Sequence, residues 1–461
     1  MAEVNPPPSG GGKEEPPSIH SLSVEGYKSI GDERTIEVRP LTILAGANSS
    51  GKSSAIQPLL LLKQTLEAPY DPGPLLLNGP NIKFTSVSQL LCFTRPRLGG
   101  EATFVFGVSM SETIGCKLYF RKGDERALEF DQMEVRKSGS FEVVKQQVIK
   151  LPENHVDINL FNENPDLFYA LLAMQDNPQF SRIFLHTIRA RCFFVQRLSP
   201  EADKPGGSGS LDSISVIPPN LESAILSTIH VPGLRGNPKR NYPVAAVGDR
   251  FPGVFEDYVA SVIAAAQRNQ DQAFLDQLNL DLRELGLTSK IRAHAVYDTQ
   301  VELRVGRLLT SSKGRADDLV SIADVGFGVS QTIPVVVALL TAKPGQLVYI
   351  EQPELHLHPR AQHAMAGLLA RAATRGVKVV IETHSSILLL GIQSQVASGT
   401  LDPARVKLHW FTRDEQTGMT NITSADLDAA GRFGDWPEDF DNVTLDAQQK
   451  YLDAAEKKLA P

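Results

Sequence analysis

The stretch LTILAGANSSGKSS, residues 41–54, decides the fold, because in it an apolar run leads into a loop bounded by two glycines. Gly46, Gly51, Lys52 and Ser53 satisfy the pattern G-x-x-x-x-G-K-[ST], with a strand-like segment before the loop and a helix-like segment after it. Glycines let such a loop turn tightly and present its N–H groups to a phosphate chain at the positive end of the following helix. The stretch predicts a nucleotide-binding α/β fold.

The residue types in this loop predict a role for each position. The Lys52 amine would reach the β- and γ-phosphates of ATP, and the Ser53 hydroxyl would bind Mg²⁺. The predicted nucleotide-binding residues of the loop are Gly46, Asn48, Ser49, Ser50, Gly51, Lys52, Ser53 and Ser54.

Composition is that of a globular protein with a sizeable core. The chain has 461 residues, of which 42% are hydrophobic and 21% charged, enough for two to three domains or one large α/β domain with insertions. Residues 401–461 hold 7 Lys and Arg and 12 Asp and Glu, a charge of −5, so the rest of the chain carries −2 of the total −7. This near-balance does not indicate a dominant nucleic-acid-binding surface, although direct binding of nucleic acid remains an alternative.

Cysteine usage and hydropathy predict a cytoplasmic protein. Cys92, Cys116 and Cys192 are widely spaced and form no C-x-x-C pair, which favours a reducing compartment without a structural zinc site. We expect no secretory signal, because the first residues are rich in Pro, Gly and charge, and no membrane span, because no window approaches 18 apolar residues.

Regular patterns occur at both ends of the chain, with a long, less regular segment between them. Strand-like runs within 70–319 predict a mainly antiparallel meander, and longer periodic runs predict helices over 165–189 and 251–286. The predicted division is a disordered tail over 1–18, the first part of the nucleotide-binding head over 19–69, an insertion over 70–319, the second part of the head over 320–400, and a small β-hairpin with an acidic helical end over 401–461.

Two parallel strands in the second part of the head end in polar residues. Residues 347–350 form an apolar strand followed by Glu351, and the strand beginning at residue 377 ends in Glu382, Thr383 and His384. Because the carboxyl ends of parallel strands form the sites of α/β folds, Glu351 would hold Mg²⁺ directly or through water. His384 is expected to sense a phosphate, and a buried core histidine is the alternative.

Other polar clusters have competing interpretations. His356 and His358, with Glu354, indicate either a zinc site or packing, and packing is favoured because a further ligand at suitable spacing is missing. The turn HVPGLRGNPKRNY, residues 230–242, carries Arg235, Lys239 and Arg240, which would face a phosphate or a neighbouring subunit, or form a solvated loop.

Taken together, these blocks resemble the ATP-binding-cassette (ABC) type of P-loop ATPase, in the branch shared by SMC and RecN heads and the overcoming-lysogenization-defect (OLD) nucleases. GANSSGKSS resembles its Walker A, VGFGVSQ at 325–331 its signature, LVYIEQPELHLHP at 347–359 its Walker B and D-loop, and IETHSS at 381–386 its switch histidine. The form EQPELHLHP, with GDWPEDF at 434–440, is most similar to AAA-like ATPases of bacterial anti-phage defence systems.

The resemblance implies an ABC-ATPase head, a mixed sheet with a P-loop core, interrupted by a large α+β insertion. It also implies a head-to-head dimer in which Gly328, Ser330 and Gln331 contact, in trans, the ATP bound to the other protomer. Glu351 corresponds to the Walker B acid, and His384 to the γ-phosphate switch. The cofactors implied are ATP and Mg²⁺, with Ser53 and Glu351 as the metal ligands.

One position departs from the family pattern. The residue after the Walker B acid is normally a glutamate that activates water, and here it is Gln352. An amide orients water but does not accept its proton, so we expect slow hydrolysis, with Glu354 as a substitute base. The predicted catalytic residues are therefore Glu351, Gln352, Glu354 and His384; Gln89 is a candidate for the Q-loop glutamine.

We expect no C-terminal Toprim domain of the kind that OLD nucleases carry, because about 75 residues follow the IETHSS motif. The sequence thus predicts an ATPase that oligomerises around ATP and regulates a separate nuclease or toxin in anti-phage defence. An SMC- or RecN-like DNA-repair or chromosome-maintenance ATPase is the first alternative. An enzyme with its own catalytic site in 70–319 is the second.

Overall fold

The computed structural model describes residues 18–92, 103–123, 127–137, 140–150, 184–199, 214–307 and 318–434, together with residues 449, 452 and 453. The predictions for the tail over 1–18, for the first part of the 165–189 helix and for the acidic end after 434 lie almost wholly outside these residues.

The core sheet contains the P-loop strand near its centre. Its strand order is β12-β17-β18-β3-β19-β20, and β20 is antiparallel to β19 whereas the other neighbours run parallel. Buried apolar runs in the central strands fit a parallel sheet that is covered on both faces. The bounds are β12 (Ile229–Val231), β17 (Leu347–Glu351), β18 (Lys378–Thr383), β3 (Leu41–Gly46), β19 (Val406–Arg413) and β20 (Thr420–Ala425).

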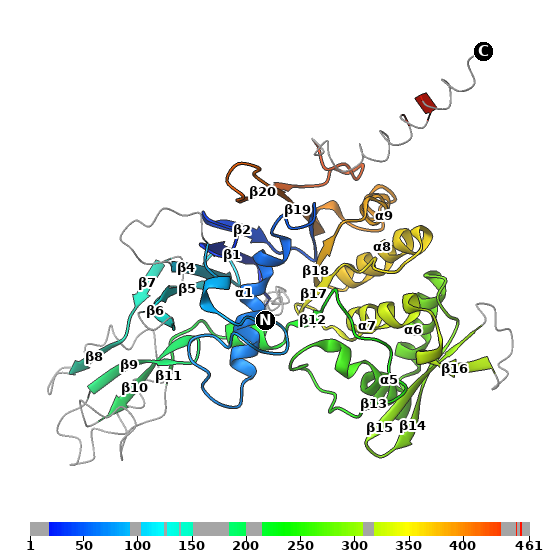
Figure 1. The fold of residues 1–461 in the computed structure, drawn as a ribbon, viewed down its shortest axis with the longest axis horizontal. Coiled ribbons are helices and arrows are strands. Elements are labelled where there is room, and N and C mark those ends of the chain that lie inside the picture. Colours follow the sequence, from blue (N-terminus) through cyan, green and yellow to red (C-terminus); the bar gives the residue numbers. More distant parts are fainter. Residues whose placement is uncertain are drawn as a thin grey trace, which may run out of the picture.

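Alternate residues of β3 enter two different apolar clusters. Leu41, Ile43 and Ala45 belong to one cluster with five helices, and Leu44 belongs to a second cluster that includes the apolar side of α1 (Lys52–Glu67). Figure 1 shows α1 on one side of the core sheet and the group of helices on the other. Those five helices are α5 (Val259–Arg268), α6 (Gln272–Glu284), α7 (Phe327–Thr341), α8 (Pro359–Thr374) and α9 (Ser386–Ala397).

A second, antiparallel sheet packs against the far side of α1. Its order is β2-β1-β4-β5-β6-β7, so the meander predicted within 70–319 is present in β4 to β7. Phe104, Phe106 and Phe120 of this sheet join the same apolar cluster as α1. The bounds are β1 (Ser21–Glu25), β2 (Arg34–Glu37), β4 (Thr103–Ser109), β5 (Gly115–Lys122), β6 (Leu128–Lys137) and β7 (Ser140–Val144).

A third sheet has the order β11-β10-β9-β8 and corrects one prediction. Residues 184–189, the last part of the predicted 165–189 helix, belong to β9, which pairs antiparallel with β10. β-Branched and aromatic residues suit this pairing, which outweighs the helical periodicity. The bounds are β8 (Gln147–Lys150), β9 (Phe184–Ala190), β10 (Phe193–Ser199) and β11 (Ile214–Ser215).

A fourth sheet lies next to α5 and α6, the helices that confirm the prediction for 251–286. Its order is β13-β15-β14, and β16 pairs with β15. Its strands are β13 (Tyr242–Pro243), β14 (Ile291–Tyr297), β15 (Gln300–Gly306) and β16 (Leu319–Ser321). Short helices complete the described elements: η1 (Val87–Gln89), α4 (Leu221–Leu226), η2 (Phe255–Tyr258), η4 (Ile322–Asp324) and η5 (Pro403–Arg405).

The predicted fold class is confirmed: the protein is a mixed α/β head around a P-loop sheet. The segment 70–319 supplies strands to both large sheets, since β4 to β7 lie in the antiparallel sheet and β12 pairs with β17. The predicted boundaries of the insertion, residues 70 and 319, therefore stay a prediction. In the part of the chain that the structure describes, every helix is too short or too polar to cross a membrane.

Candidate functional site

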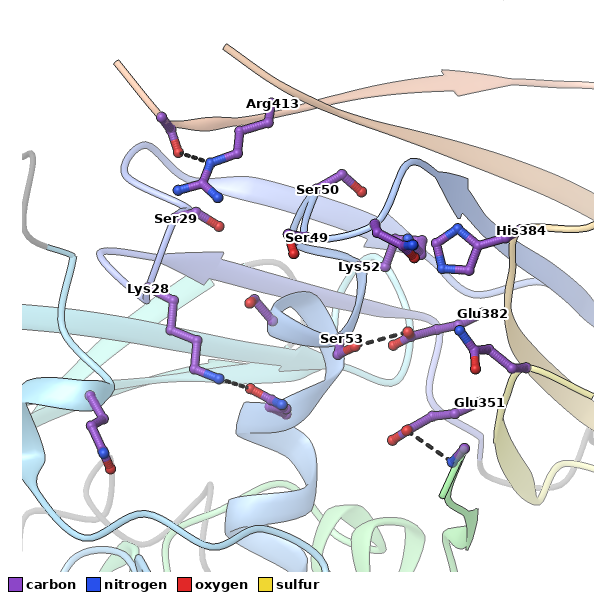
Figure 2. Close-up of a pocket in the computed structure, with 18 of the residues that line it drawn as sticks. Lys28, Ser29, Ser49, Ser50, Lys52, Ser53, Glu351, Glu382, His384 and Arg413 are labelled. Atoms are coloured by element: carbon purple, nitrogen blue, oxygen red, sulfur yellow. Dashed lines mark hydrogen bonds between the residues drawn. The ribbon is translucent and has the colours of Figure 1, made fainter. Parts of the chain in front are cut away.

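The carboxyl ends of β3, β17 and β18 open into a cavity of about 720 Å³ (Figure 2). Its walls come from distant parts of the chain: the loop before β2, the P-loop, the segment after β12, and the turn between β19 and β20. The lining residues include Lys28, Ser29, Asn48, Ser49, Ser50, Gly51, Lys52, Ser53, Ser54, Gln57, Gln89, Gly233, Leu234, Glu351, Gln352, Glu382, His384, Arg413, Thr417 and Gly418.

The P-loop depends on its two glycines for both backbone angle and space. Gly46 has φ 142° and Gly51 has φ 100°, a region that other residues rarely adopt. A Cβ on Gly46 would lie 2.2 Å from the Phe411 carbonyl oxygen, and one on Gly51 would lie 2.3 Å from Thr420 Oγ1. Helix α1 begins directly after Gly51 without a side-chain cap, so its first N–H groups face the cavity ready for an anion.

Lys52 contacts the loop itself. Its Nζ donates hydrogen bonds to the carbonyl oxygens of Gly46 at 3.1 Å and Ala47 at 2.7 Å. Burial lowers the pKa of Lys52, while the negative charges of Glu382 and Glu354 oppose that shift. The amine thus lies at the cavity wall and donates to backbone oxygens, the same kind of acceptor that a phosphate oxygen would be.

Ser53 contacts Glu382, a residue that the sequence analysis did not include in the site. Ser53 Oγ donates to Glu382 Oε2 at 2.9 Å (Figure 2), and the Tyr349 hydroxyl donates to Glu382 Oε1. Burial, and then the nearby charge of Glu351, raise the pKa of Glu382 to about 7, although the two hydrogen bonds and Lys52 act in the opposite direction. The signal was in the sequence: Glu382 ends the strand next to that of Glu351.

Glu351 contacts residues in β12 and in the segment that follows it. Its Oε1 lies 3.1 Å from His230 Nε2, and its Oε2 accepts the Gly233 N–H at 3.0 Å. His230 is buried, stacks on Tyr349, and places its Nδ1 3.0 Å from Asn81 Oδ1. Burial raises the pKa of Glu351, but the His230 contact and the Gly233 N–H outweigh it, so the net shift is downward. Sequence reasoning missed His230, because its position depends on the pairing of β12 with β17.

The two candidates for activating water occupy different places. Gln352 lines the cavity and has φ 46°, an unusual angle that the loop after β17 imposes. Glu354 is buried and is not among the residues that line the cavity; its Oε1 accepts the Thr383 hydroxyl at 2.8 Å and the His384 N–H at 3.0 Å. Burial raises the pKa of Glu354. Its contacts hold the end of β18 in place.

His384 lies in the cavity wall beside the P-loop, as the prediction of a phosphate sensor requires. Burial and the positive charge of Lys52 lower the pKa of His384, opposed by a hydrogen bond with the Gly46 backbone. The imidazole is therefore neutral at neutral pH and keeps one N–H donor.

The signature residues lie outside this cavity in the same chain. Ser330 Oγ donates to the Phe327 carbonyl at 3.2 Å, and Gln331 Nε2 donates to the Gly236 carbonyl at 3.0 Å. Helix α7 has no side-chain cap at Gly326, and Phe327 is 52% exposed beside Gly328. The contact of Gly328, Ser330 and Gln331 with a partner's nucleotide stays a prediction.

The basic turn over 230–242 has a different role from those expected. Arg235 is buried, and its guanidinium donates to the carbonyl oxygens of Gln331 at 2.9 Å and Glu351 at 2.8 Å. It thereby links α7 to the end of β17 and faces neither phosphate nor solvent. Arg240 does remain exposed, in an ion pair with Asp324.

Glu354, His356 and His358, the residues weighed for a zinc site, do not form a metal-binding cluster in the described part of the chain. Among the described residues, no group of three or more His, Cys, Asp and Glu side chains is placed to hold a metal ion. His358 caps α8 by accepting the Arg360 N–H at 3.3 Å, and the His356 ring packs near Phe327. These contacts fit the packing interpretation.

The C-terminal hairpin is joined to the P-loop. Thr420 Oγ1 donates to the Ser50 carbonyl, 370 positions earlier in the chain, at 2.8 Å and lies 2.8 Å from Ser29 Oγ. Gln89, the Q-loop candidate, lines the cavity, and its Oε1 accepts the Thr85 N–H. Sequence periodicity carries no signal for a contact between residues as far apart in the chain as Ser50 and Thr420.

In comparisons with known proteins, a family model matches part of the chain. Residues 237–390 match the family model described as "AAA domain, putative AbiEii toxin, Type IV TA system". No curated protein matches the chain.

Three solved structures are similar over most of the chain. An SMC head bound to the C-winged helix domain of ScpA has 12% identity and a TM-score of 0.46 and covers 90% of this chain and 99% of its own. The SMC head domain from Thermotoga maritima has 10% identity and a TM-score of 0.37, covering 88% and 98%. The Smc head with an extended coiled coil, bound to the C-terminal domain of ScpA derived from Pyrococcus furiosus, has 10% identity and a TM-score of 0.44, covering 95% and 99%. At these TM-scores the similarity adds nothing to what the sheet order establishes.

Proposed function

We propose that the chain is an ABC-type P-loop ATPase related to this AAA family, that it binds ATP with Mg²⁺ and hydrolyses ATP slowly, and that it regulates a separate effector through an ATP-bound dimer. The observation that carries this proposal is the uncapped N-terminus of α1, which opens into the cavity where Glu351, Glu382 and His384 converge. N–H groups, a lysine and a neutral histidine on one side, and carboxylates on the other, suit a phosphate chain with its metal ion.

The donor set suits magnesium. Ser53 Oγ and the carboxylates of Glu351 and Glu382 are hard oxygen donors, which Mg²⁺ prefers. The described residues do not gather a three-residue metal cluster, so phosphate and water oxygens would complete the coordination, as is usual for Mg²⁺. Bound Mg²⁺ would supply neutralisation of the developing charge on the phosphates.

Slow hydrolysis would follow from Gln352, the cavity-lining residue at the position where a water-activating glutamate is expected. The Gln352 amide orients a water molecule but does not take its proton. Glu354 is buried, is not among the residues that line the cavity, and accepts hydrogen bonds from Thr383 and His384. Each site therefore has donors that position the γ-phosphate but a weak base, and the ATP-bound state is long-lived.

A second copy of the chain would complete the site. The N-terminus of α7, with exposed Phe327, presents free N–H groups that would meet the γ-phosphate bound to the other protomer. Leu234, which is 92% exposed, lies at the cavity rim and adds apolar surface to the same interface. The γ-phosphate would be the contact that distinguishes the closed dimer from the open one.

The effector is proposed to be a separate nuclease or toxin in anti-phage defence. The description of the family that matches 237–390 names a putative toxin and a toxin–antitoxin system. In this scheme the ATPase head supplies the nucleotide-dependent switch, and its partner supplies the damaging activity.

The first experiment measures ATP binding by calorimetry, and mass in solution with and without ATP, for wild type and Lys52→Ala. Wild type should bind ATP and double its mass, and Lys52→Ala should do neither. Lys343→Ala, which removes an exposed lysine paired with Asp249, is the matched control. A Lys52→Ala protein that binds ATP and assembles like wild type would refute the assignment of the loop.

The second experiment tests the effector. Phage plaque counts are compared for cells that express the chain alone, with the protein encoded beside it, or with that protein and Lys52→Ala. Protection should need both proteins and an intact Lys52. Protection by the chain alone would move the damaging activity into this chain, and ATP-dependent, salt-sensitive DNA binding would favour the DNA-repair alternative.

A further inference from the structure

The P-loop hydroxyl contacts a carboxylate other than the Walker B acid. Ser53 Oγ and Glu382 Oε2 are 2.9 Å apart (Figure 2), whereas Glu351 Oε1 lies next to His230 and Glu351 Oε2 accepts the Gly233 N–H. Two carboxylates therefore line the cavity, and only Glu382 is hydrogen-bonded to the metal-binding hydroxyl.

Strand order explains this arrangement. Glu382 on β18 pairs with Leu44 on β3, and Glu351 on β17 pairs with Glu382. Neighbouring strands are about 4.8 Å apart, so Glu382 is one strand from the P-loop strand and Glu351 is two strands away, about 9.6 Å. The carboxylate nearest to Ser53 is thus the one on β18.

The spacing of the two oxygens matches a metal coordination edge. Mg²⁺ holds its oxygen ligands at about 2.0–2.1 Å in an octahedron, so adjacent ligands lie about 2.9 Å from each other. Ser53 Oγ and Glu382 Oε2 already have this separation, 2.9 Å. A metal ion could replace the shared proton without a large movement of either group.

The carboxylate is also held in one orientation. The Tyr349 hydroxyl donates to Oε1 of Glu382, which leaves Oε2 directed at Ser53. Tyr349 is fully buried and stacks on His230, the residue that holds Glu351. Tyr349 is therefore a positioning residue that fixes Glu382 and contacts the support of Glu351.

We propose that Glu382 is the direct carboxylate ligand of Mg²⁺ beside Ser53, and that Glu351 acts on the metal through water. The proposal rests on the ATP- and Mg²⁺-binding function proposed above. It changes which strand supplies the metal ligand: β18, which also carries His384, takes the place of β17. The metal and the γ-phosphate sensor would then be attached to the same strand end.

The experiment measures ATP affinity by calorimetry in EDTA and in Mg²⁺ for the full chain and its variants. The ratio of the two affinities in wild type defines the gain from the metal. Glu382→Gln should reduce this gain at least tenfold while the affinity for metal-free ATP stays within about threefold, because only a metal contact is lost. Glu351→Gln should reduce the gain less than Glu382→Gln, and Glu222→Gln, at an exposed position on α4, should not change it.

Further variants protect the test against a folding defect. Far-UV circular dichroism checks that each variant is folded. Glu382→Asp retains a carboxylate on a shorter side chain and should retain part of the gain; it replaces the amide variant if that protein does not fold. Mn²⁺ bound per chain in the presence of ATP, measured by electron paramagnetic resonance, should fall in the same order.

Each outcome has a definite meaning. If Glu351→Gln abolishes the metal gain while Glu382→Gln keeps it, or if both lose it equally, Glu382 is not the direct ligand, and the proposed function still stands. If wild type binds ATP neither with nor without Mg²⁺, the proposed function fails and the metal assignment fails with it.

Discussion

Arg235 is expected to be the most important residue of the basic turn for stability, although the turn looks like a solvated loop in the sequence. Arg235 is 5% exposed, and its guanidinium donates to the carbonyl oxygens of Gln331 and Glu351. Burial lowers the pKa of Arg235 to about 10, so it remains charged at neutral pH. A hydrogen bond from a charged donor contributes about 1.5–3 kcal/mol, so Arg235→Ala should lower the free energy of unfolding by about 3–6 kcal/mol.

Arg240, five positions along the same turn, provides the comparison. Its ion pair with Asp324 is formed by side chains that are 68% and 47% exposed. Exposed pairs contribute about 0.2–1 kcal/mol, so Arg240→Ala should lower the free energy of unfolding by no more than that amount. The two variants lose the same side chain, and the expected difference between them comes from burial and from the carbonyl partners.

The assay is urea unfolding at pH 7 without nucleotide, followed by circular dichroism and by tryptophan fluorescence to test two-state behaviour. Lys at position 235 keeps the charge but not the forked geometry, so Arg235→Lys should recover only part of the loss. If Arg235→Ala and Arg240→Ala unfold at the same urea concentration, the link between α7 and β17 does not stabilise the fold and the argument is wrong.

Three further predictions concern the site. Gln352→Glu supplies a carboxylate at the cavity wall and should speed steady-state ATP turnover by about 100-fold or more; an unchanged rate would show that another group takes the proton. Gly51→Ala puts a Cβ 2.3 Å from Thr420 Oγ1 at φ 100° and should weaken ATP binding, measured by calorimetry, at least tenfold. Gly73→Ala is the control, because Gly73 has a similar φ of 94° with open space around it, and this variant should leave ATP affinity unchanged. Equal effects of the two variants would mean that general backbone strain is the cause. Phe327→Asp should prevent ATP-dependent doubling of mass while ATP affinity stays within about threefold, and a variant that still dimerises would exclude the α7 end from the interface.

The sequence was sufficient where the chemistry is contiguous. The P-loop, the strand that precedes it and the helix that follows it are specified by residues 41–54, since glycine angles, apolar runs and helix starts are local properties. Glu351, which ends β17, and His384, which directly follows β18, were found in the same way, from apolar runs followed by polar residues. The helices after these strands also follow local periodicity.

The tertiary structure decided which of these groups meet. Strand order places Glu382 beside Ser53, and the pairing of β12 with β17 brings His230 to Glu351. Arg235 and Thr420 act on the site through carbonyl groups far away in the sequence. Sequence patterns report periodicity and turn chemistry along the chain, whereas strand neighbours are chosen by the packing of many side chains at once. The sequence was therefore sufficient to predict the P-loop and the strand ends beside it, and only the fold determined which carboxylate faces the Ser53 hydroxyl.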